Sequence, residues 1–300
     1  MYMMTREEIK AYLSRIGISE IQPPTKSYLF ELHKAHVKNL SWQTIDIFGG
    51  KPAAIDFRQS VQLILNRRSG YCFHLNGAFS TLLRSLGFTV FLHRAGVQPP
   101  GAEPRVNSFH LGLTVNLIND QLEEEKWIID VGLGDMPFEP LPLHSGIYDQ
   151  SPFIYKVAES SVVANGWRLE HDPLASFVGV DFDPAVVHNF DEFKPKHEHY
   201  SRSVDSPWFN MFLIRHRHET GSNEIRGCVW SKRGISGIQK MEITKKSQWL
   251  EVLGDLFGEQ LVNYSNLERD EFWNRVLSAH EDWKKSKTDA QLNESFGPAV

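Results

Sequence analysis

The spacing of apolar residues changes near Phe88 from a helical period to a strand-like period, and this change constrains the fold more than any other feature. Up to Gly87 the apolar residues recur at helical spacing, whereas residues 89–94, 109–118 and 126–131 have the pattern of strands. Weaker strand patterns follow at 153–163 and 167–170, then strands at 211–216 and 227–232 and helices at 247–257 and 267–285. We therefore expect an α+β fold in which a bundle of short helices precedes a sheet or small barrel.

Composition excludes several classes of protein. The 300 residues suit two or three sub-domains, and the formal charge of −5, without a long basic stripe, argues against a nucleic-acid partner. No apolar run approaches the roughly 18 residues that a membrane span requires. The N-terminus is charged early and lacks the apolar core of a secretory signal. Two cysteines form no disulfide framework, so we expect Cys72 and Cys228 to be unpaired and the protein to be cytoplasmic.

Cys72 lies at the predicted start of a helix. The segment 68–76 reads Arg-Ser-Gly-Tyr-Cys-Phe-His-Leu-Asn, and the helical spacing of Phe79, Leu82 and Leu86 follows it. The unpaired N–H groups of a first helical turn and the positive end of the helix dipole favour a thiolate over a thiol. A buried cysteine that only packs needs no such position, so Cys72 is a candidate nucleophile.

A base and a residue to orient it follow from the next two strands. In 109–118 the leucines form one face, and His110 lies on the other. Asp130 likewise lies opposite the Trp127 face of 126–131. If Asn119-Asp120-Gln121 is the hairpin turn and Ile118 pairs with Leu122, His110 is directly opposite Asp130. The pattern therefore predicts a Cys72, His110 and Asp130 triad.

Other motifs in the sequence carry less information about function. Gly132-Leu-Gly134 offers backbone N–H groups of the kind that bind anions. The chain has no P-loop lysine motif and no complete G-x-G-x-x-G, which argues against a nucleoside-triphosphate or dinucleotide enzyme. Pairs of histidines at 33 and 36, 197 and 199, and 216 and 218 have metal-like spacing but no cysteine partners nearby, so we expect no metal.

Several segments together resemble the arylamine N-acetyltransferase family. The segments are 68–73, Ser108-Phe-His110, and Ile129-Asp130-Val-Gly-Leu-Gly134 with the proline-rich 136–143. Residues 29–42, 190–208 and 256–258 extend the resemblance over nearly the whole chain. The chain departs from the family at His74, where an acidic residue is usual, at Ser69, where glycine is common, and at Leu133, where many members carry an aromatic residue. In the early loop, Ser41-Trp42-Gln43 replaces Phe-Glu-Asn.

The resemblance implies an architecture and a set of site residues. It implies a helical bundle over 1–88 that carries the nucleophile, a β-barrel over 89–205 that carries His110 and Asp130, and an α/β lid over 206–300, with a papain-like Cys-His-Asp core. It also implies acetyl-CoA as co-substrate and an arylamine or hydrazine as acceptor. Coenzyme A would contact Gly132, Gly134, Tyr200 and Ser206, and the acceptor pocket would include Phe73, Phe109 and Leu133.

The implied reaction is acyl transfer through an acyl-Cys72 intermediate, with His110 moving the proton. Two alternatives stay open on the residues alone: a thiol hydrolase or transglutaminase-like enzyme with the same triad, and a non-catalytic homologue, for which His74 is the only indication. The sequence does not identify the physiological amine, the preferred acyl group or the oligomeric state.

Overall fold

The computed structural model describes residues 2–119 and 121–295, and side chains up to residue 285. The helices are α1 (Arg6–Arg15), α2 (Lys26–Asn39), α3 (Ile45–Phe48), α4 (Phe57–Leu65), α5 (Cys72–Ser85), α6 (Lys194–Arg202), α7 (Lys246–Phe257) and α8 (Asn266–Ser295), with a 3₁₀ turn at Phe190–Phe193. The strands are β1 (Trp42–Gln43), β2 (Thr89–Gln98), β3 (His110–Ile118), β4 (Glu124–Ile128), β5 (Leu141–Pro142), β6 (Gly146–Gln150), β7 (Phe153–Glu159), β8 (Trp167–Glu170), β9 (Gly179–Val186), β10 (Leu213–His218), β11 (Gly221–Arg226), β12 (Val229–Gly234) and β13 (Gly237–Glu242).

The N-terminal helices begin and end at the expected signals. Thr5 and Glu8 form a reciprocal capping box at the start of α1, with Glu8 N–H donating to Thr5 Oγ1 at 3.2 Å and Thr5 N–H donating to Glu8 Oε2 at 2.9 Å. Helix α5 begins at Cys72, as predicted, and its N-cap residue Tyr71 makes no side-chain capping hydrogen bond. The first turn of α5 therefore keeps N–H groups that no cap occupies.

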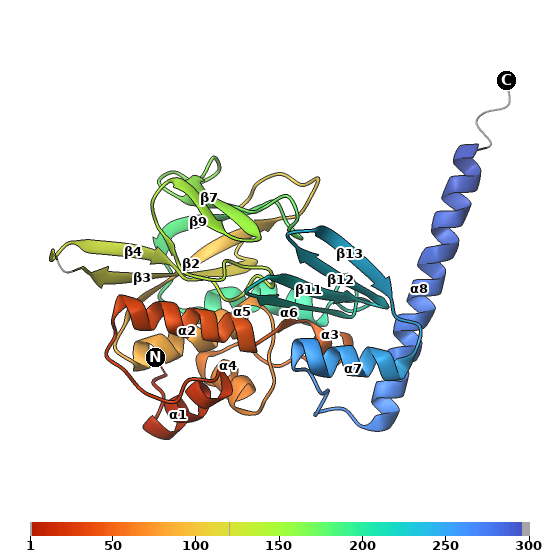
Figure 1. The fold of residues 1–300 in the computed structure, drawn as a ribbon, viewed down its shortest axis with the longest axis horizontal. Helices are drawn as coiled ribbons and strands as arrows, with labels where there is room; N and C mark the ends of the chain where they lie inside the picture. The colour runs from red at the N-terminus through yellow and green to blue at the C-terminus, as the bar shows by residue number, and fades with distance from the viewer. Residues whose placement is uncertain (1, 120, 296–300) are drawn as a thin grey trace.

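An antiparallel sheet of eight strands forms a nearly closed barrel beside the helices (Figure 1). Its strand order is β5-β4-β3-β2-β9-β8-β7-β6, so β9 returns from far along the chain to pair with β2. Buried residues from α1, α2, α4, α5 and the barrel strands form one continuous hydrophobic cluster. The cysteine-bearing helix is therefore held against the barrel by a shared core.

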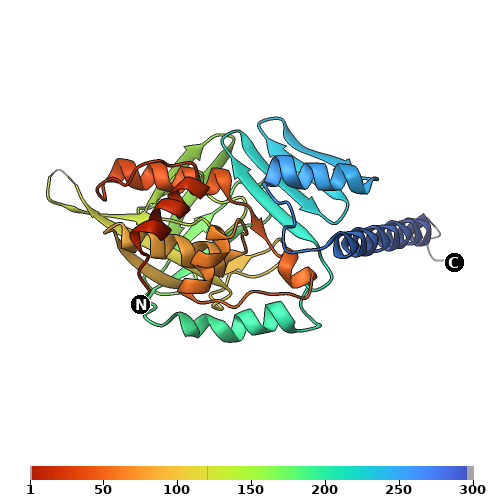
Figure 2. The same cartoon turned by 90° about the horizontal axis from the view of Figure 1, so that it is seen from below.

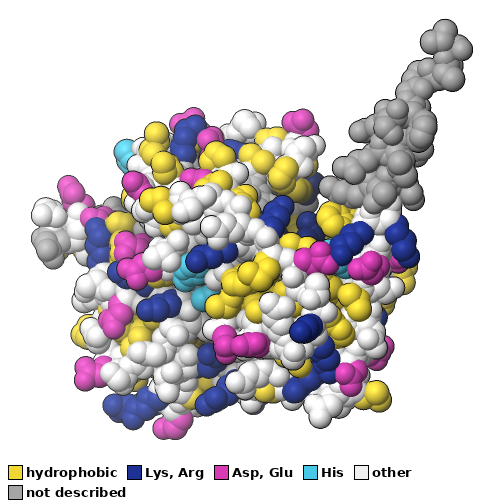
Figure 3. Space-filling model, turned by 45° about the vertical axis from the view of Figure 1, so that its right-hand side comes forward, with side chains coloured by type: hydrophobic (Ala, Val, Ile, Leu, Met, Phe, Trp, Pro, Cys, Tyr) yellow, Lys and Arg dark blue, Asp and Glu magenta, His cyan; other side chains and the backbone are white. Residues whose placement is uncertain are grey.

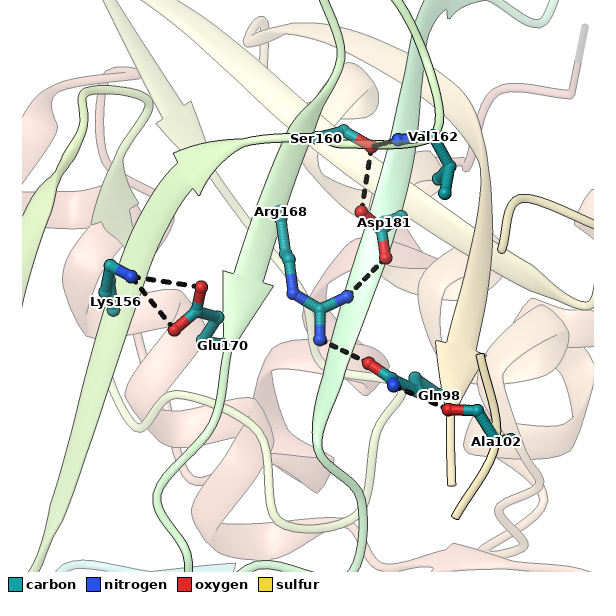
Figure 4. Close-up of polar contacts among 8 residues, drawn as sticks. All are labelled: Gln98, Ala102, Lys156, Ser160, Val162, Arg168, Glu170 and Asp181. Atoms are coloured by element: carbon teal, nitrogen blue, oxygen red, sulfur yellow. Dashed lines mark hydrogen bonds and ion pairs between the residues drawn. The ribbon is translucent and has the colours of Figure 1, made fainter. Parts of the chain in front are cut away.

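A buried ion pair joins three barrel strands (Figure 4). Asp181 on β9 is fully buried and pairs with Arg168 on β8, and it also accepts a hydrogen bond from Ser160 Oγ at 2.8 Å. Arg168 also donates to the side chain of Gln98 on β2, and Gln98 Nε2 donates to Ala102 O at 2.6 Å. These bonds anchor the start of the loop that leads to His110.

A second antiparallel sheet has the order β1-β10-β11-β12-β13. Its edge strand β1 comes from the N-terminal third of the chain, and Ile45 and Phe48 of α3 belong to the core of this sheet. Helix α7 covers one face, where Trp249 and Leu253 cluster with Ile214 and Ile225 (Figures 1 and 2). Helix α8 starts beside this sheet and extends away from the rest of the molecule.

The surface seen in Figure 3 carries acidic and basic side chains interspersed, without a large area of one sign. None of the helices in the described ranges combines the length and the apolar character needed to cross a membrane.

Candidate active site

Cys72 occupies the first position of α5, beside the strand that carries His110. It is 4% exposed, its Sγ lies 3.6 Å from Phe109 O as a hydrogen-bond donor, and neither it nor Cys228 forms a disulfide. Phe109 directly precedes His110 at the start of β3. The contact between Cys72 and the Phe109 carbonyl therefore holds the start of α5 against the start of β3, which carries His110.

His110 and Asp130 form a buried pair. His110 Nε2 lies 2.6 Å from Asp130 Oδ2, and the two residues are each 1% exposed. Because Nε2 faces the carboxylate, Nδ1 is the ring nitrogen left for Cys72. The structure thus brings together the three residues that the sequence singled out.

The predicted hairpin register that led to this pairing is wrong by two residues. Ile118 pairs with Glu124 rather than Leu122, because the turn is wider: Gln121 and Glu123 N–H groups donate to Asn119 Oδ1 at 3.0 and 2.9 Å. Asp120 lies outside the described residues. A shift of two residues leaves the same side chains on each face, so Asp130 still points towards His110 from just beyond the end of β4.

Asn76 holds the Asp130 carboxylate and was missed by the sequence reasoning. Its Nδ2 donates to Asp130 Oδ1 at 2.9 Å and to Leu111 O at 2.6 Å, while its Oδ1 accepts from Val131 N–H at 3.0 Å. Gly132 N–H also donates to Asp130 Oδ1, at 2.9 Å. The only signal for Asn76 in the sequence is its position one helical turn after Cys72, which places both residues on the same face of α5.

The charge state of His110 follows from its two neighbours. Burial by itself lowers the pKa of an imidazole, but the charge and hydrogen bond of Asp130, together with Cys72, more than offset this effect and raise the pKa of His110 to about 10 from its ordinary 6.5. His110 is therefore an imidazolium at neutral pH. An imidazolium beside a sulfur atom stabilises that sulfur as an anion.

The glycine loop after Asp130 lies directly on the cysteine helix. A Cβ at Gly132 would lie 2.9 Å from Cys72 Cα and 2.8 Å from Asn76 Nδ2, so only glycine allows this approach. Gly134 has a φ of +86°, and a Cβ there would lie 2.7 Å from Arg215 Cδ. Leu133 between them is buried. The loop therefore contacts both Cys72 and the second sheet.

Aromatic rings from three segments gather near Phe109. Its ring stacks on Tyr200 of α6 with centroids 3.8 Å apart and lies 5.2 Å from Trp208. Ser206 does not point its hydroxyl outward: Oγ donates to Tyr200 O at 2.6 Å and accepts from Trp208 N–H at 3.3 Å, and the residue is buried. Ser206 thus holds Tyr200 and Trp208 in place.

Phe73 is fully buried against Phe193, with centroids 5.3 Å apart.

The unusual residue His74 lies behind the nucleophile in a buried polar pocket. Its Nε2 is 3.3 Å from Ala53 O, and burial is the main reason that its pKa falls to about 3. Its ring lies 5.9 Å from that of His197, whose Nδ1 is hydrogen bonded to Tyr71 at 2.5 Å. His74 is therefore neutral at pH 7. Within the described ranges no cluster of three or more histidine, cysteine or acidic residues could hold a metal ion.

Residues 27–265 match the protein family described as N-acetyltransferase. A Salmonella typhimurium protein named arylamine N-acetyltransferase / N-hydroxyarylamine O-acetyltransferase is 32% identical over 148 residues, which cover 48% of this chain and 50% of that protein. The arylamine N-acetyltransferase of Escherichia coli is 34% identical over 146 residues, covering 47% of this chain and 49% of its own. The chain belongs to the arylamine N-acetyltransferase family, although it spans about half the length of these curated relatives.

Solved structures share the fold. The arylamine N-acetyltransferase of Mycobacterium marinum in complex with CoA aligns with a TM-score of 0.77 and 22% identity, over 89% of this chain and 98% of that one. The Salmonella typhimurium enzyme aligns with a TM-score of 0.74 and 23% identity, over 93% of this chain and 100% of that one. The combination of helices and sheets with a nearly closed eight-stranded barrel is therefore the fold of known members of the family.

Proposed function

We propose that this protein transfers an acetyl group from acetyl-CoA to the nitrogen of arylamines, hydrazines or arylhydroxylamines through an acyl-Cys72 intermediate. The observation that carries the proposal is the buried His110–Asp130 pair at 2.6 Å beside a cysteine at a helix start. The names of the relatives supply the acetyl group and the arylamine and hydroxyarylamine acceptors, and the Mycobacterium marinum structure contains CoA. Hydrazines as acceptors come from the family resemblance of the sequence. The match to these relatives covers only about half of their length, so the activity is proposed for this chain.

In the first half-reaction, the Cys72 sulfur attacks the thioester carbonyl carbon as a thiolate paired with imidazolium His110. A carbon–sulfur bond to Cys72 forms, and the bond to the coenzyme A sulfur then breaks. His110 gives its proton to that departing sulfur, so coenzyme A leaves as a thiol. Asp130 accepts from Nε2 and keeps the ring oriented with Nδ1 towards the sulfur atoms.

In the second half-reaction, the amine nitrogen attacks the carbonyl carbon of acyl-Cys72. Neutral His110 takes a proton from the attacking nitrogen, and the bond between the carbonyl carbon and Cys72 breaks. The amide leaves and the thiolate–imidazolium pair is restored, so the two substrates react in turn.

The developing oxyanion needs N–H donors close to Cys72. Phe109 N–H already donates to Asn107 Oδ1 at 3.2 Å, which leaves the uncapped first turn of α5, including Cys72 N–H, as the better source. Gly132 and Gly134 allow the loop beside Cys72 to approach coenzyme A closely. Phe109 and Tyr200 are the aromatic surfaces we assign to substrate contact, with Ser206, Phe73 and Leu133 shaping the site from behind.

The three parts of the chain would have separate roles. Residues 1–88 supply the nucleophile, residues 89–205 supply the base and its carboxylate, and residues 206–300 cover the site as a lid. We infer that the core resembles that of papain-like thiol enzymes, because a cysteine at a helix start faces a strand histidine that a third side chain orients. A cytoplasmic location and small-molecule substrates remain the expectation for such an enzyme.

Intact-mass spectrometry tests the proposal directly. The protein is exposed to acetyl-CoA, freed of excess donor, and then treated with an arylamine or hydrazine. We expect a gain of one acetyl group on Cys72 that is stable in buffer and removed by the amine, with no gain for Cys72→Ala and a normal gain for the matched control Cys228→Ala. An adduct lost rapidly in water would favour a hydrolase, and the absence of any adduct would favour a non-catalytic protein.

A further inference from the structure

Two buried histidines, His74 and His197, line a small polar cavity behind Cys72. The cavity has a volume of about 10 Å³, and Tyr71 lines it as well. His74 is 4% exposed and His197 is 2% exposed. Within the part of the chain that the structure describes, His74 Nδ1 and His197 Nε2 are buried and have no hydrogen-bond partner. Because buried polar atoms are almost always hydrogen bonded, these two nitrogens indicate a small polar ligand between the rings.

The hydrogen bonds of the other two ring nitrogens determine where the protons lie. His74 Nε2 is 3.3 Å from Ala53 O, and a carbonyl only accepts, so His74 carries its proton on Nε2 and has a lone pair on Nδ1. Burial raises the pKa of Tyr71 well above its ordinary 10, so its hydroxyl keeps its proton and donates it to His197 Nδ1, at 2.5 Å. Burial also lowers the pKa of His197 to about 4, so the ring is neutral at pH 7 and carries its proton on Nε2. The cavity therefore lies between a donor, His197 Nε2, and an acceptor, His74 Nδ1.

One water molecule fits both the volume and the polarity of this cavity. A volume of about 10 Å³ is close to the smallest that holds a single water. Such a water accepts from His197 Nε2 and donates to His74 Nδ1, and the side chains of Gln43 and Thr44 line the same space. A metal ion does not fit, because among the described residues no group of three or more histidine, cysteine or acidic side chains could hold one.

The hydrogen-bonded groups join the first turn of α5 to helix α6. Tyr71 is the N-cap residue of α5, and His197 lies on α6 one turn before Tyr200. The Tyr71 ring also packs against Trp208, with centroids 5.0 Å apart, and Trp208 lies 5.3 Å from Tyr200. The position of the Tyr200 ring therefore depends on the bond between Tyr71 and His197.

We propose that His74 and His197 bind one water molecule between them and, together with Tyr71, position Tyr200 for the amine acceptor. The inference rests on the acyl transfer proposed for Cys72, in which the stacked rings of Tyr200 and Phe109 contact substrate. An arylamine has a ring that can pack against these rings, whereas the reacting end of acetyl-CoA is aliphatic. His74, His197 and Tyr71 do not contact the reacting atoms, so they act as positioning residues for the second half-reaction.

Steady-state kinetics separates a positioning role from a general loss of structure. Because the two substrates react in turn, kcat/KM for each substrate reports its own half-reaction. The test variant is His197→Phe, which keeps a ring but removes both nitrogens, and the matched control is His188→Phe, the same change at an exposed histidine outside this cavity. For His197→Phe we expect kcat/KM for the arylamine to fall about tenfold and kcat/KM for acetyl-CoA to change by less than about twofold.

A conservative variant gives a rescue. In His197→Asn the amide oxygen can occupy the place of Nδ1 and accept from Tyr71, so most of the loss in kcat/KM for the arylamine should be recovered. An unchanged kcat/KM for the arylamine in His197→Phe would overturn the proposal. Equal losses for both substrates would overturn it as well, because His197 would then act on the fold or on the first half-reaction.

A crystal structure at a resolution that shows ordered water provides a readout that needs no activity. We expect one water within hydrogen-bond distance of His197 Nε2 and His74 Nδ1 in the unaltered protein. In His197→Phe we expect this water to be lost and the Tyr200 ring to be displaced. The absence of the water from the unaltered protein, or an undisplaced Tyr200 ring in the variant, would overturn the proposal. If instead the unaltered protein transfers no acetyl group, the function proposed for Cys72 fails, and the crystal structures still decide whether this site exists.

Discussion

Replacing Asp130 by asparagine should convert His110 from a charged to a neutral imidazole, while the side chain at position 130 keeps almost the same shape. The pKa of about 10 for His110, against an ordinary 6.5, corresponds to stabilisation of the imidazolium on the order of 5 kcal/mol. In Asp130→Asn that stabilisation is lost while burial, which lowers the pKa, is kept. His110 should then be neutral at pH 7.

The substitution also changes which ring nitrogen carries the proton. The amide oxygen can still accept from Asn76 Nδ2 and Gly132 N–H, as Asp130 Oδ1 does now. The amide nitrogen then faces His110 Nε2 as a donor, which leaves the proton on Nδ1, towards Cys72. A neutral ring in this tautomer cannot accept a proton from the thiol, so acylation of Cys72 should slow by about 10³-fold or more.

The assay is the pH dependence of Cys72 alkylation by iodoacetamide, followed by intact mass, together with the single-turnover rate of acetylation. We expect rapid alkylation at neutral pH in the unaltered protein and slow alkylation in Asp130→Asn. The control is Asp183→Asn, which removes a carboxylate of the same barrel that lies 3.6 Å from Arg94. Equal alkylation profiles for Asp130→Asn and the unaltered protein would refute the role assigned to the His110–Asp130 pair.

The same proton affects stability. Because the folded-state pKa of His110 is raised, the folded protein binds more protons than the unfolded chain between pH 6.5 and about 10. The stabilisation is complete below pH 6.5 and is lost as the pH rises towards 10. The melting temperature of the unaltered protein should therefore fall more steeply over this interval than that of His110→Ala, and parallel curves would contradict the raised pKa.

Three further substitutions test the scaffold of the site. Asn76→Ala leaves Asp130 Oδ1 and two backbone groups with fewer partners, so urea unfolding should show a loss of about 2 kcal/mol, and an unchanged midpoint would contradict this. Gly132→Ala should slow acetylation at least about tenfold, because its Cβ would displace Cys72, and a normal single-turnover rate would show that the close approach is dispensable. Asp181→Ala strands a largely buried guanidinium and should cost about 3–5 kcal/mol in urea unfolding, while the specific activity of the folded fraction stays normal.

Local sequence patterns were sufficient to predict the helix and the strands that carry the site. The capping box at Thr5 and Glu8, the start of α5 at Cys72 and the two-residue alternation of β3 all follow from interactions between residues close in sequence. The faces of β3 and of the segment around Asp130 were also correct, because a period of two survives a register error of two residues. The sequence alone thus determined which side chains could meet.

Tertiary structure decided how they meet. The wider turn at Asn119, the return of β9 to pair with β2, and the pairing of β1 with β10 join segments whose contact no local period reveals. The role of Asn76 could not be predicted from its local sequence, because it depends on the contact with Asp130 that forms in the folded structure. Long-range pairing depends on which complementary surfaces and buried polar groups find one another in three dimensions, so the charge of His110 and the cavity between His74 and His197 exist only in the folded molecule.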